Sequence, residues 1–113
     1  FKPRTDDVRE APAQYIAAAL LKAGARITAF DPVAMEIFKR AFPDKRMKYA
    51  ESALEATEGA DALIVCTEWD EFRTIEATDL ARTMKGRVIM DGRNIFDRKE
   101  METEGFVYFG IGL

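Results

Sequence analysis

The sequence predicts an α/β protein of the doubly wound class, with three layers and a mostly parallel sheet. Three observations lead to this prediction. Short apolar runs of strand length alternate with longer amphipathic stretches of helix length. Glycine or proline follows several of these segments, and the joints between them are short. Strands that alternate with helices in this way form parallel sheets whose crossovers are helical.

The first predicted elements are a helix over residues 12–23 and a strand over residues 26–30. Pro12 suits the first position of a helix, and Gly24 stands where this helix would end. The apolar residues of the stretch fall on one stripe, as in a helix that packs on a sheet. The strand ends at Asp31-Pro32 because proline cannot continue a hydrogen-bonded ladder.

A helix over residues 34–41 follows, and its apolar residues recur at spacings of three and four. Residues 47–49 give a weaker signal, which we interpret as a short edge strand. Ser52 can cap a further helix that runs through Thr57 and ends at Gly59. The alternation of helix and strand therefore continues through this part of the chain.

The clearest strand covers residues 62–66, which are apolar without interruption, the pattern of a parallel strand covered on both faces. A helix over 76–84, a strand at 88–90, a short helix near 98–104 and a last strand at 106–109 complete the chain. Doubly wound folds open with a strand ahead of the first helix, and none is present here. We therefore expect a Rossmann-like fold that lacks its first strand, in a fragment whose parent continues upstream.

Composition excludes several classes of function. The chain has 113 residues, which fits one domain, and its net charge of −3 argues against general affinity for nucleic acid. It contains no histidine, which argues against zinc chemistry and histidine-based catalysis, and its single cysteine, Cys66, excludes an internal disulfide. Neither a membrane-spanning apolar run nor a signal peptide is present, so we predict a cytoplasmic protein that does not contact membranes.

Two cations are the candidate ligand-binding residues. Ligands of open parallel sheets bind outside the carboxyl ends of the strands. Arg93 follows the strand at 88–90, and Lys2 would follow the missing first strand. We predict that these side chains converge on an anion such as a diphosphate, because an arginine fork and a lysine point charge can both bind phosphate oxygens. The spacing is equally compatible with each cation pairing with a nearby carboxylate such as Asp6 or Asp91.

Three other polar or aromatic positions have structural interpretations. Asp31 stands where dinucleotide folds carry a ribose-binding acid, but no glycine-rich turn accompanies it, so a strand-ending turn residue is favoured. Cys66 has no histidine or lysine beside it to lower its pKa, which indicates a buried structural thiol. Trp69 could pack on a ligand ring or inside the protein, and we favour packing.

Four motifs, taken together, are similar to those of a known family: Phe1 to Pro12, Phe30-Asp31-Pro32, Cys66 to Phe72, and Asp91-Gly92-Arg93-Asn94. The chain resembles the C-terminal, UDP-binding domain of the UDP-glucose/GDP-mannose dehydrogenase family from its first residue to its last. The second pair of motifs looks more like the UDP-glucose 6-dehydrogenase branch than like the GDP-mannose or UDP-N-acetylmannosamine dehydrogenases.

The resemblance implies a part of an enzyme that oxidises UDP-glucose to UDP-glucuronate with two NAD, in nucleotide-sugar metabolism and polysaccharide biosynthesis. Phe1 and Lys2 match positions that contact the UDP-sugar, and Arg93 matches an arginine that reaches the substrate across the subunit interface of a homo-oligomer. Arg9 matches a position that touches NAD. The catalytic cysteine and the main NAD-binding domain lie upstream in this family, so the fragment alone is expected to be inactive, with no catalytic residue and no metal.

Two alternatives come from other classes of function. A receiver-type signalling module would use Asp6 and Asp7, Thr67 and Lys85 as its acidic pocket, switch and lysine, but Lys85 precedes its strand rather than ending one. The chain could also serve chiefly as an assembly surface in an oligomer. A domain of a GDP-mannose or UDP-N-acetylmannosamine dehydrogenase is the alternative within the family.

Overall fold

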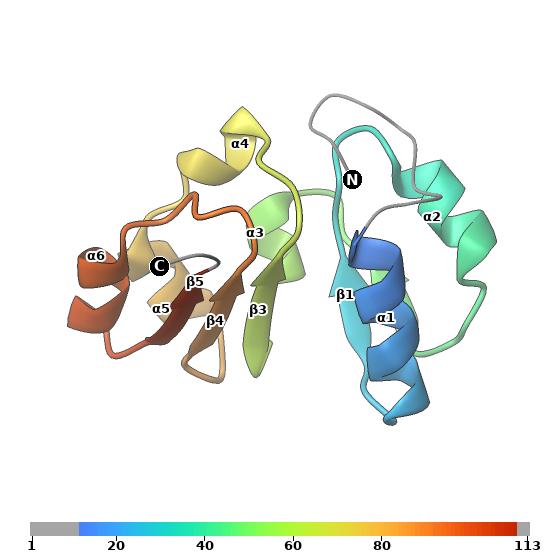
Figure 1. The fold of residues 1–113 in the computed structure, drawn as a ribbon, viewed down its shortest axis with the longest axis horizontal. Coiled ribbons are helices and arrows are strands. Elements are labelled where there is room, and N and C mark those ends of the chain that lie inside the picture. Colours follow the sequence, from blue (N-terminus) through green and yellow to red (C-terminus); the bar gives the residue numbers. More distant parts are fainter. Residues whose placement is uncertain (1–11, 111–113) are drawn as a thin grey trace. The chain divides into compact units, whose positions relative to one another are not determined.

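The computed structural model describes residues 12–110 and shows alternating helices and short strands (Figure 1). The elements are α1 (Pro12–Lys22), β1 (Ile27–Ala29), α2 (Met35–Ala41), β2 (Met47–Tyr49), α3 (Ala53–Ala56), β3 (Ala62–Val65), α4 (Asp70–Arg73), α5 (Ala77–Thr83), β4 (Val88–Asp91), α6 (Arg98–Thr103) and β5 (Val107–Gly110). The elements from α1 to α3 belong to one compact unit, and those from β3 to β5 belong to a second.

The first unit holds α1, α2 and α3 and a parallel pair of strands, β1 and β2. Helix α1 ends as predicted at Gly24, which adopts a left-handed φ of 93°. The Gly24 N–H donates to the carbonyl of Leu21 and the Ala25 N–H to that of Leu20, both at 3.0 Å. This pair of bonds satisfies two of the carbonyls that a helix end leaves without partners, and only glycine adopts the left-handed backbone at low cost.

The turn from β1 into α2 is built by Asp31. Its Oδ1 accepts hydrogen bonds from the backbone N–H groups of Val33 and Ala34, both at 2.9 Å. Asp31 is therefore the turn residue that the sequence favoured. The turn places Ala34 in the core with none of its surface exposed, and Ile37 and Phe38 of α2 pack against it.

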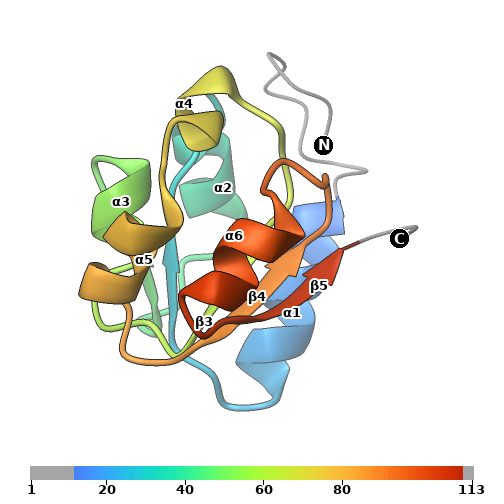
Figure 2. The same cartoon turned by 90° about the vertical axis from the view of Figure 1, so that its left-hand side faces the viewer.

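The second unit contains a parallel sheet with the strand order β3-β4-β5. Helices α5 and α6 cover one face of this sheet, as Figure 2 shows. Ile89 and Tyr108 pair across β4 and β5 and are buried on the covered face. Leu80 of α5 and Met101 of α6 are also buried, with 0% and 1% exposed. Burial of such side chains is the main source of stability for this unit.

The opposite face of the same sheet is also apolar. Met90 of β4 and Val107 and Phe109 of β5 are 48%, 54% and 53% exposed. Met90 pairs with Phe109 in the ladder, so these side chains stand on one face. Strands with apolar side chains on both faces are typical of parallel sheets.

The predicted class is confirmed, since the described residues alternate helices with parallel strands. The strands form two sheets, β1-β2 and β3-β4-β5, rather than one. The prediction that a first strand is missing concerns residues ahead of α1, which lie outside the described part.

Each predicted helix and strand lies within two residues of an observed element, and the helix predicted from Ser52 through Thr57 corresponds to α3. The Ser52 hydroxyl does cap α3, since it accepts a hydrogen bond from the Glu55 N–H at 3.1 Å. Helix α4 was not predicted, because a single turn is too short to show periodicity. Among residues 12–110, no helix combines the length and hydrophobicity needed to span a bilayer.

Candidate functional site

The candidate site is formed by the loops that follow β3 and β4. These strands are parallel neighbours, and the last residues of both, Val65 and Asp91, are paired in the ladder. The loops that follow them therefore leave the sheet at the same edge, where doubly wound folds bind their ligands. Glu68 lies in the first loop and Arg93 in the second.

Gly92 lets the second loop leave β4 close to the end of β3. The Gly92 N–H donates to the Val65 carbonyl at 2.9 Å. A Cβ atom at position 92 would lie only 2.9 Å from that same oxygen, closer than real Cβ atoms come to backbone oxygen. Glycine is needed here for close approach, and it sets the distance between the two loops.

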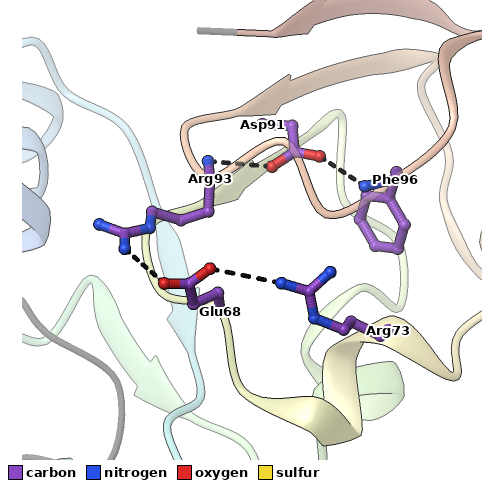
Figure 3. Close-up of polar contacts among 5 residues, drawn as sticks. All are labelled: Glu68, Arg73, Asp91, Arg93 and Phe96. Carbon is purple, nitrogen blue, oxygen red and sulfur yellow. Dashed lines mark hydrogen bonds and ion pairs between the residues drawn. The ribbon is translucent and has the colours of Figure 1, made fainter.

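Asp91 organises the loop from inside the protein. Its side chain is only 1% exposed, yet it carries a carboxylate. Oδ1 accepts from the Arg93 N–H at 3.1 Å and Oδ2 from the Phe96 N–H at 2.9 Å (Figure 3). Oδ2 also accepts from the Tyr108 hydroxyl at 2.7 Å. A buried carboxylate is costly unless it is hydrogen-bonded, and these three donors provide that compensation.

Tyr108 of β5 is the side-chain donor of this network. It is 3% exposed, and burial, aided by its hydrogen bond to the Asp91 carboxylate, raises the pKa of its phenol well above the usual value. Arg98 of α6 donates to the Tyr108 carbonyl at 3.0 Å, and its guanidinium lies 5.2 Å from the centre of the tyrosine ring. Tyr108 is therefore held as a neutral donor that joins β5 and α6 to the loop after β4.

Arg93, Glu68 and Arg73 form an ionic cluster at the surface of the site (Figure 3). Nη2 of Arg93 lies 2.7 Å from Oε1 of Glu68, and Nη2 of Arg73 lies 3.3 Å from Oε2. The side chains of Arg93, Glu68 and Arg73 are 34%, 33% and 47% exposed. One carboxylate thus bridges two guanidinium groups that remain open to solvent.

The structure shows which carboxylate the Arg93 side chain contacts. The arginine does pair with a carboxylate, but with Glu68 rather than with the nearby Asp91. Asp91 instead binds the backbone N–H of Arg93. The sequence did not suggest Glu68 as the partner of Arg93, or Arg73 as the second partner of Glu68. The one signal for these contacts was that Glu68 and Arg73 follow β3, the neighbour of the strand that precedes Arg93.

The other predicted ligand-binding residues, Phe1, Lys2 and Arg9, lie outside the described residues, as does Asp6. The convergence of Lys2 and Arg93 on an anion therefore stays a prediction. No G-x-G-x-x-G turn occurs in the sequence.

Cys66 and Trp69 have the structural characters expected of them. Cys66 is a free, partly buried thiol, and burial raises its pKa, which disfavours the reactive thiolate. Trp69 is 9% exposed and immediately precedes α4. Glu68, whose side chain is one-third exposed, lies between the buried residues Thr67 and Trp69 in the loop from β3.

The sequence matches the model of a known family. Residues 1–98 match the UDP binding domain of the UDP-glucose/GDP-mannose dehydrogenase family. This match covers most of the chain and includes the loops after β3 and β4.

Individual relatives agree with the family match. The chain is 42% identical to a UDP-glucose 6-dehydrogenase of Rhizobium meliloti (strain 1021) over 99% of its length and 25% of the relative's. It is 45% identical to the UDP-glucose 6-dehydrogenase AglM of Haloferax volcanii over 88% of its length and 22% of the relative's. The chain therefore spans about a quarter of the length of the curated relatives it matches.

A solved structure also resembles the chain over 99% of its length, with a TM-score of 0.81 and 29% identity. It is the NDP-N-acetyl-D-galactosaminuronic acid dehydrogenase of Methanosarcina mazei Go1, of which 22% is covered. The UDP-D-ManNAc dehydrogenase of Pyrococcus horikoshii has the same fold at a TM-score of 0.54, with 88% of this chain and 29% of that one covered and 23% identity.

Replacing Tyr108 with phenylalanine should lower the free energy of unfolding by about 1–3 kcal/mol, because the buried Asp91 carboxylate loses a donor. Urea unfolding followed by circular dichroism measures this change. Tyr15→Phe is the matched control, since Tyr15 is 70% exposed and its hydroxyl should contribute less than about 0.5 kcal/mol. Equal effects of the two substitutions would contradict the role given to Tyr108.

The hydrogen bond between Tyr108 and Asp91 also predicts that the free energy of unfolding depends on pH. Tyr108 has a raised pKa when folded, so its contribution to stability is complete below the unfolded tyrosine pKa of about 10 and is lost as the pH rises above it. Between about pH 9 and 11, the unfolding free energy of the wild type should thus fall faster than that of Tyr108→Phe. The gap between the two unfolding free energies should therefore narrow as the pH rises. A gap that stays constant over this range would rule out the raised pKa.

Replacing Gly92 with alanine should destabilise the protein by about 1–3 kcal/mol, because the added methyl collides with the Val65 carbonyl. The loop must move away from β3 to accept it. Urea unfolding gives the free energy, and hydrogen exchange at the Gly92 amide should speed up as its bond to Val65 lengthens. An unchanged exchange rate would show that the loop does not depend on this approach.

Proposed function

Because this chain belongs to the UDP-glucose/GDP-mannose dehydrogenase family, of which it is the UDP binding domain, we propose that it holds the UDP moiety of UDP-glucose in a longer UDP-glucose 6-dehydrogenase. Such an enzyme oxidises the sugar to the carboxylate of UDP-glucuronate with NAD as the oxidant. The domain binds the nucleotide end of the substrate, and the chemistry at the sugar takes place on residues outside this chain.

Arg93 carries this proposal. Its guanidinium stands at the edge of the sheet where doubly wound folds bind ligands, and it is 34% exposed. Its main chain is tied to the buried Asp91. An arginine so anchored can present several parallel N–H donors to the oxygens of a diphosphate. Lys2 adds a second charge, and Phe1 contacts the nucleotide beside it.

Remote binding of this kind supports catalysis by positioning. A nucleotide held firmly at one end keeps the sugar bound near the reacting groups and so raises kcat/KM through a lower KM. The sugar C6 is thereby presented to a cysteine and to NAD that the rest of the enzyme supplies. Arg9 touches NAD at the boundary with that part.

Three further features complete the proposal. The sugar is glucose, because the relatives cited above at 42% and 45% identity are UDP-glucose 6-dehydrogenases. These relatives favour the UDP-glucose branch of the family over the GDP-mannose and UDP-N-acetylmannosamine branches. The enzyme is a cytoplasmic homo-oligomer, in which Arg93 reaches the substrate of an adjacent subunit. The family match disfavours the receiver-type alternative.

Calorimetric titration of UDP into the full-length enzyme that carries this domain tests the proposal. Arg93→Ala should weaken UDP binding by about ten- to a hundred-fold, the cost of losing charge-assisted hydrogen bonds. The UDP affinity of Arg93→Lys should lie between those of the wild type and Arg93→Ala, because lysine keeps the positive charge but lacks the planar fork of donors. Lys2→Ala should also weaken binding.

Arg82→Ala is the matched control. Arg82 lies in α5, is 74% exposed and pairs with Asp79, so its loss removes the same charge away from the loops after β3 and β4. UDP affinity should remain within about two-fold of the wild type, since exposed charges far from a ligand are screened. If Arg93→Ala and Lys2→Ala bind UDP as tightly as Arg82→Ala, the site is wrongly assigned.

A further inference from the structure

Glu68 contacts two arginines that come from different segments of the second unit. Its Oε1 accepts from Nη2 of Arg93, in the loop after β4, at 2.7 Å. Its Oε2 accepts from Nη2 of Arg73, in α4, at 3.3 Å. Figure 3 shows the carboxylate between the two guanidinium groups. Each oxygen therefore serves one arginine.

The cluster keeps an excess of positive charge and free donors. Two guanidinium groups and one carboxylate give a net charge of about +1, since arginine stays protonated in proteins. A guanidinium has about five N–H donors, and within residues 12–110 the structure records one partner for that of Arg93. Glu68 can thus orient Arg93 and still leave most of its donors for an anion.

Arg93 is held at both ends. The buried Asp91 fixes its backbone through the N–H, and Glu68 fixes its guanidinium across the gap between the two loops. An arginine side chain has many rotamers, and ordering them on binding reduces affinity. A bond that orders the side chain before the ligand arrives removes part of that cost. The short distance to Glu68 is that of a charge-assisted hydrogen bond.

We propose that Glu68 is a positioning residue, which holds the Arg93 guanidinium in the orientation that receives the phosphate oxygens of the nucleotide. This rests on the proposed function, since it assumes that Arg93 binds the ligand. Glu68 itself does not contact the nucleotide, because two anions would repel each other. Arg73 balances the second oxygen of Glu68 and so keeps the carboxylate from moving wholly onto Arg93.

The test uses the full-length enzyme, with UDP as the calorimetric probe and UDP-glucose in steady-state kinetics. Glu68→Gln should raise the Kd for UDP and the KM for UDP-glucose by about two- to ten-fold, with kcat nearly unchanged. Glu68→Asp, which keeps the charge on a shorter stem, should recover part of the loss. Glu71→Gln is the matched control, because Glu71 is an exposed carboxylate of α4 with no recorded side-chain contact to Arg93.

A double-mutant cycle separates this inference from the proposed function. In an Arg93→Ala background, Glu68→Gln should have no further effect on UDP affinity, because the side chain to be positioned is gone. If Arg93→Ala alone leaves affinity unchanged, the proposed function fails. If Arg93→Ala weakens binding but Glu68→Gln leaves affinity unchanged or improves it, Arg93 binds the ligand and Glu68 does not position it.

Discussion

The site depends on one buried carboxylate. Asp91 ends a central strand with its side chain inside the protein, where an ion without partners would be strongly unfavourable. Its hydrogen bonds come from two backbone N–H groups of the following loop and from Tyr108 on the next strand. The loop cannot change its path without leaving a buried charge unsatisfied. The backbone position of Arg93 is therefore set by its hydrogen bond to Asp91.

Two carboxylates act on Arg93 in different ways because they differ in burial. Asp91 is almost fully buried, so its hydrogen bonds contribute to the stability of the fold. Glu68 is one-third exposed, and an ion pair in that environment contributes little to stability. What an exposed pair can supply is orientation. Asp91 therefore stabilises the loop after β4 through its backbone, and Glu68 contacts the guanidinium of Arg93 at the surface.

Most of the fold could be predicted because its signals are local. The uninterrupted apolar run at residues 62–66 identifies a parallel strand, and Gly24 marks a helix end through its backbone preference. The site was harder to predict. Glu68 and Arg93 are 25 residues apart, and their contact follows from β3 and β4 being neighbours, which sequence spacing does not reveal. Asp91 was considered only as an ion-pair partner, although an aspartate two residues before a backbone donor is a common turn pattern.

The placement of these residues also bears on what they can do for a reaction. The nucleotide end of a UDP-sugar is chemically unchanged when the sugar is oxidised, so a contact there is equally strong in the ground state and the transition state. Uniform binding of this kind lowers KM and leaves kcat as it is. In the function proposed above, Arg93 and Glu68 capture and align the substrate, while the barrier is lowered at the other end of the molecule. Under that proposal, the domain takes part in an oxidation by holding the nucleotide, and the reacting groups lie outside this chain.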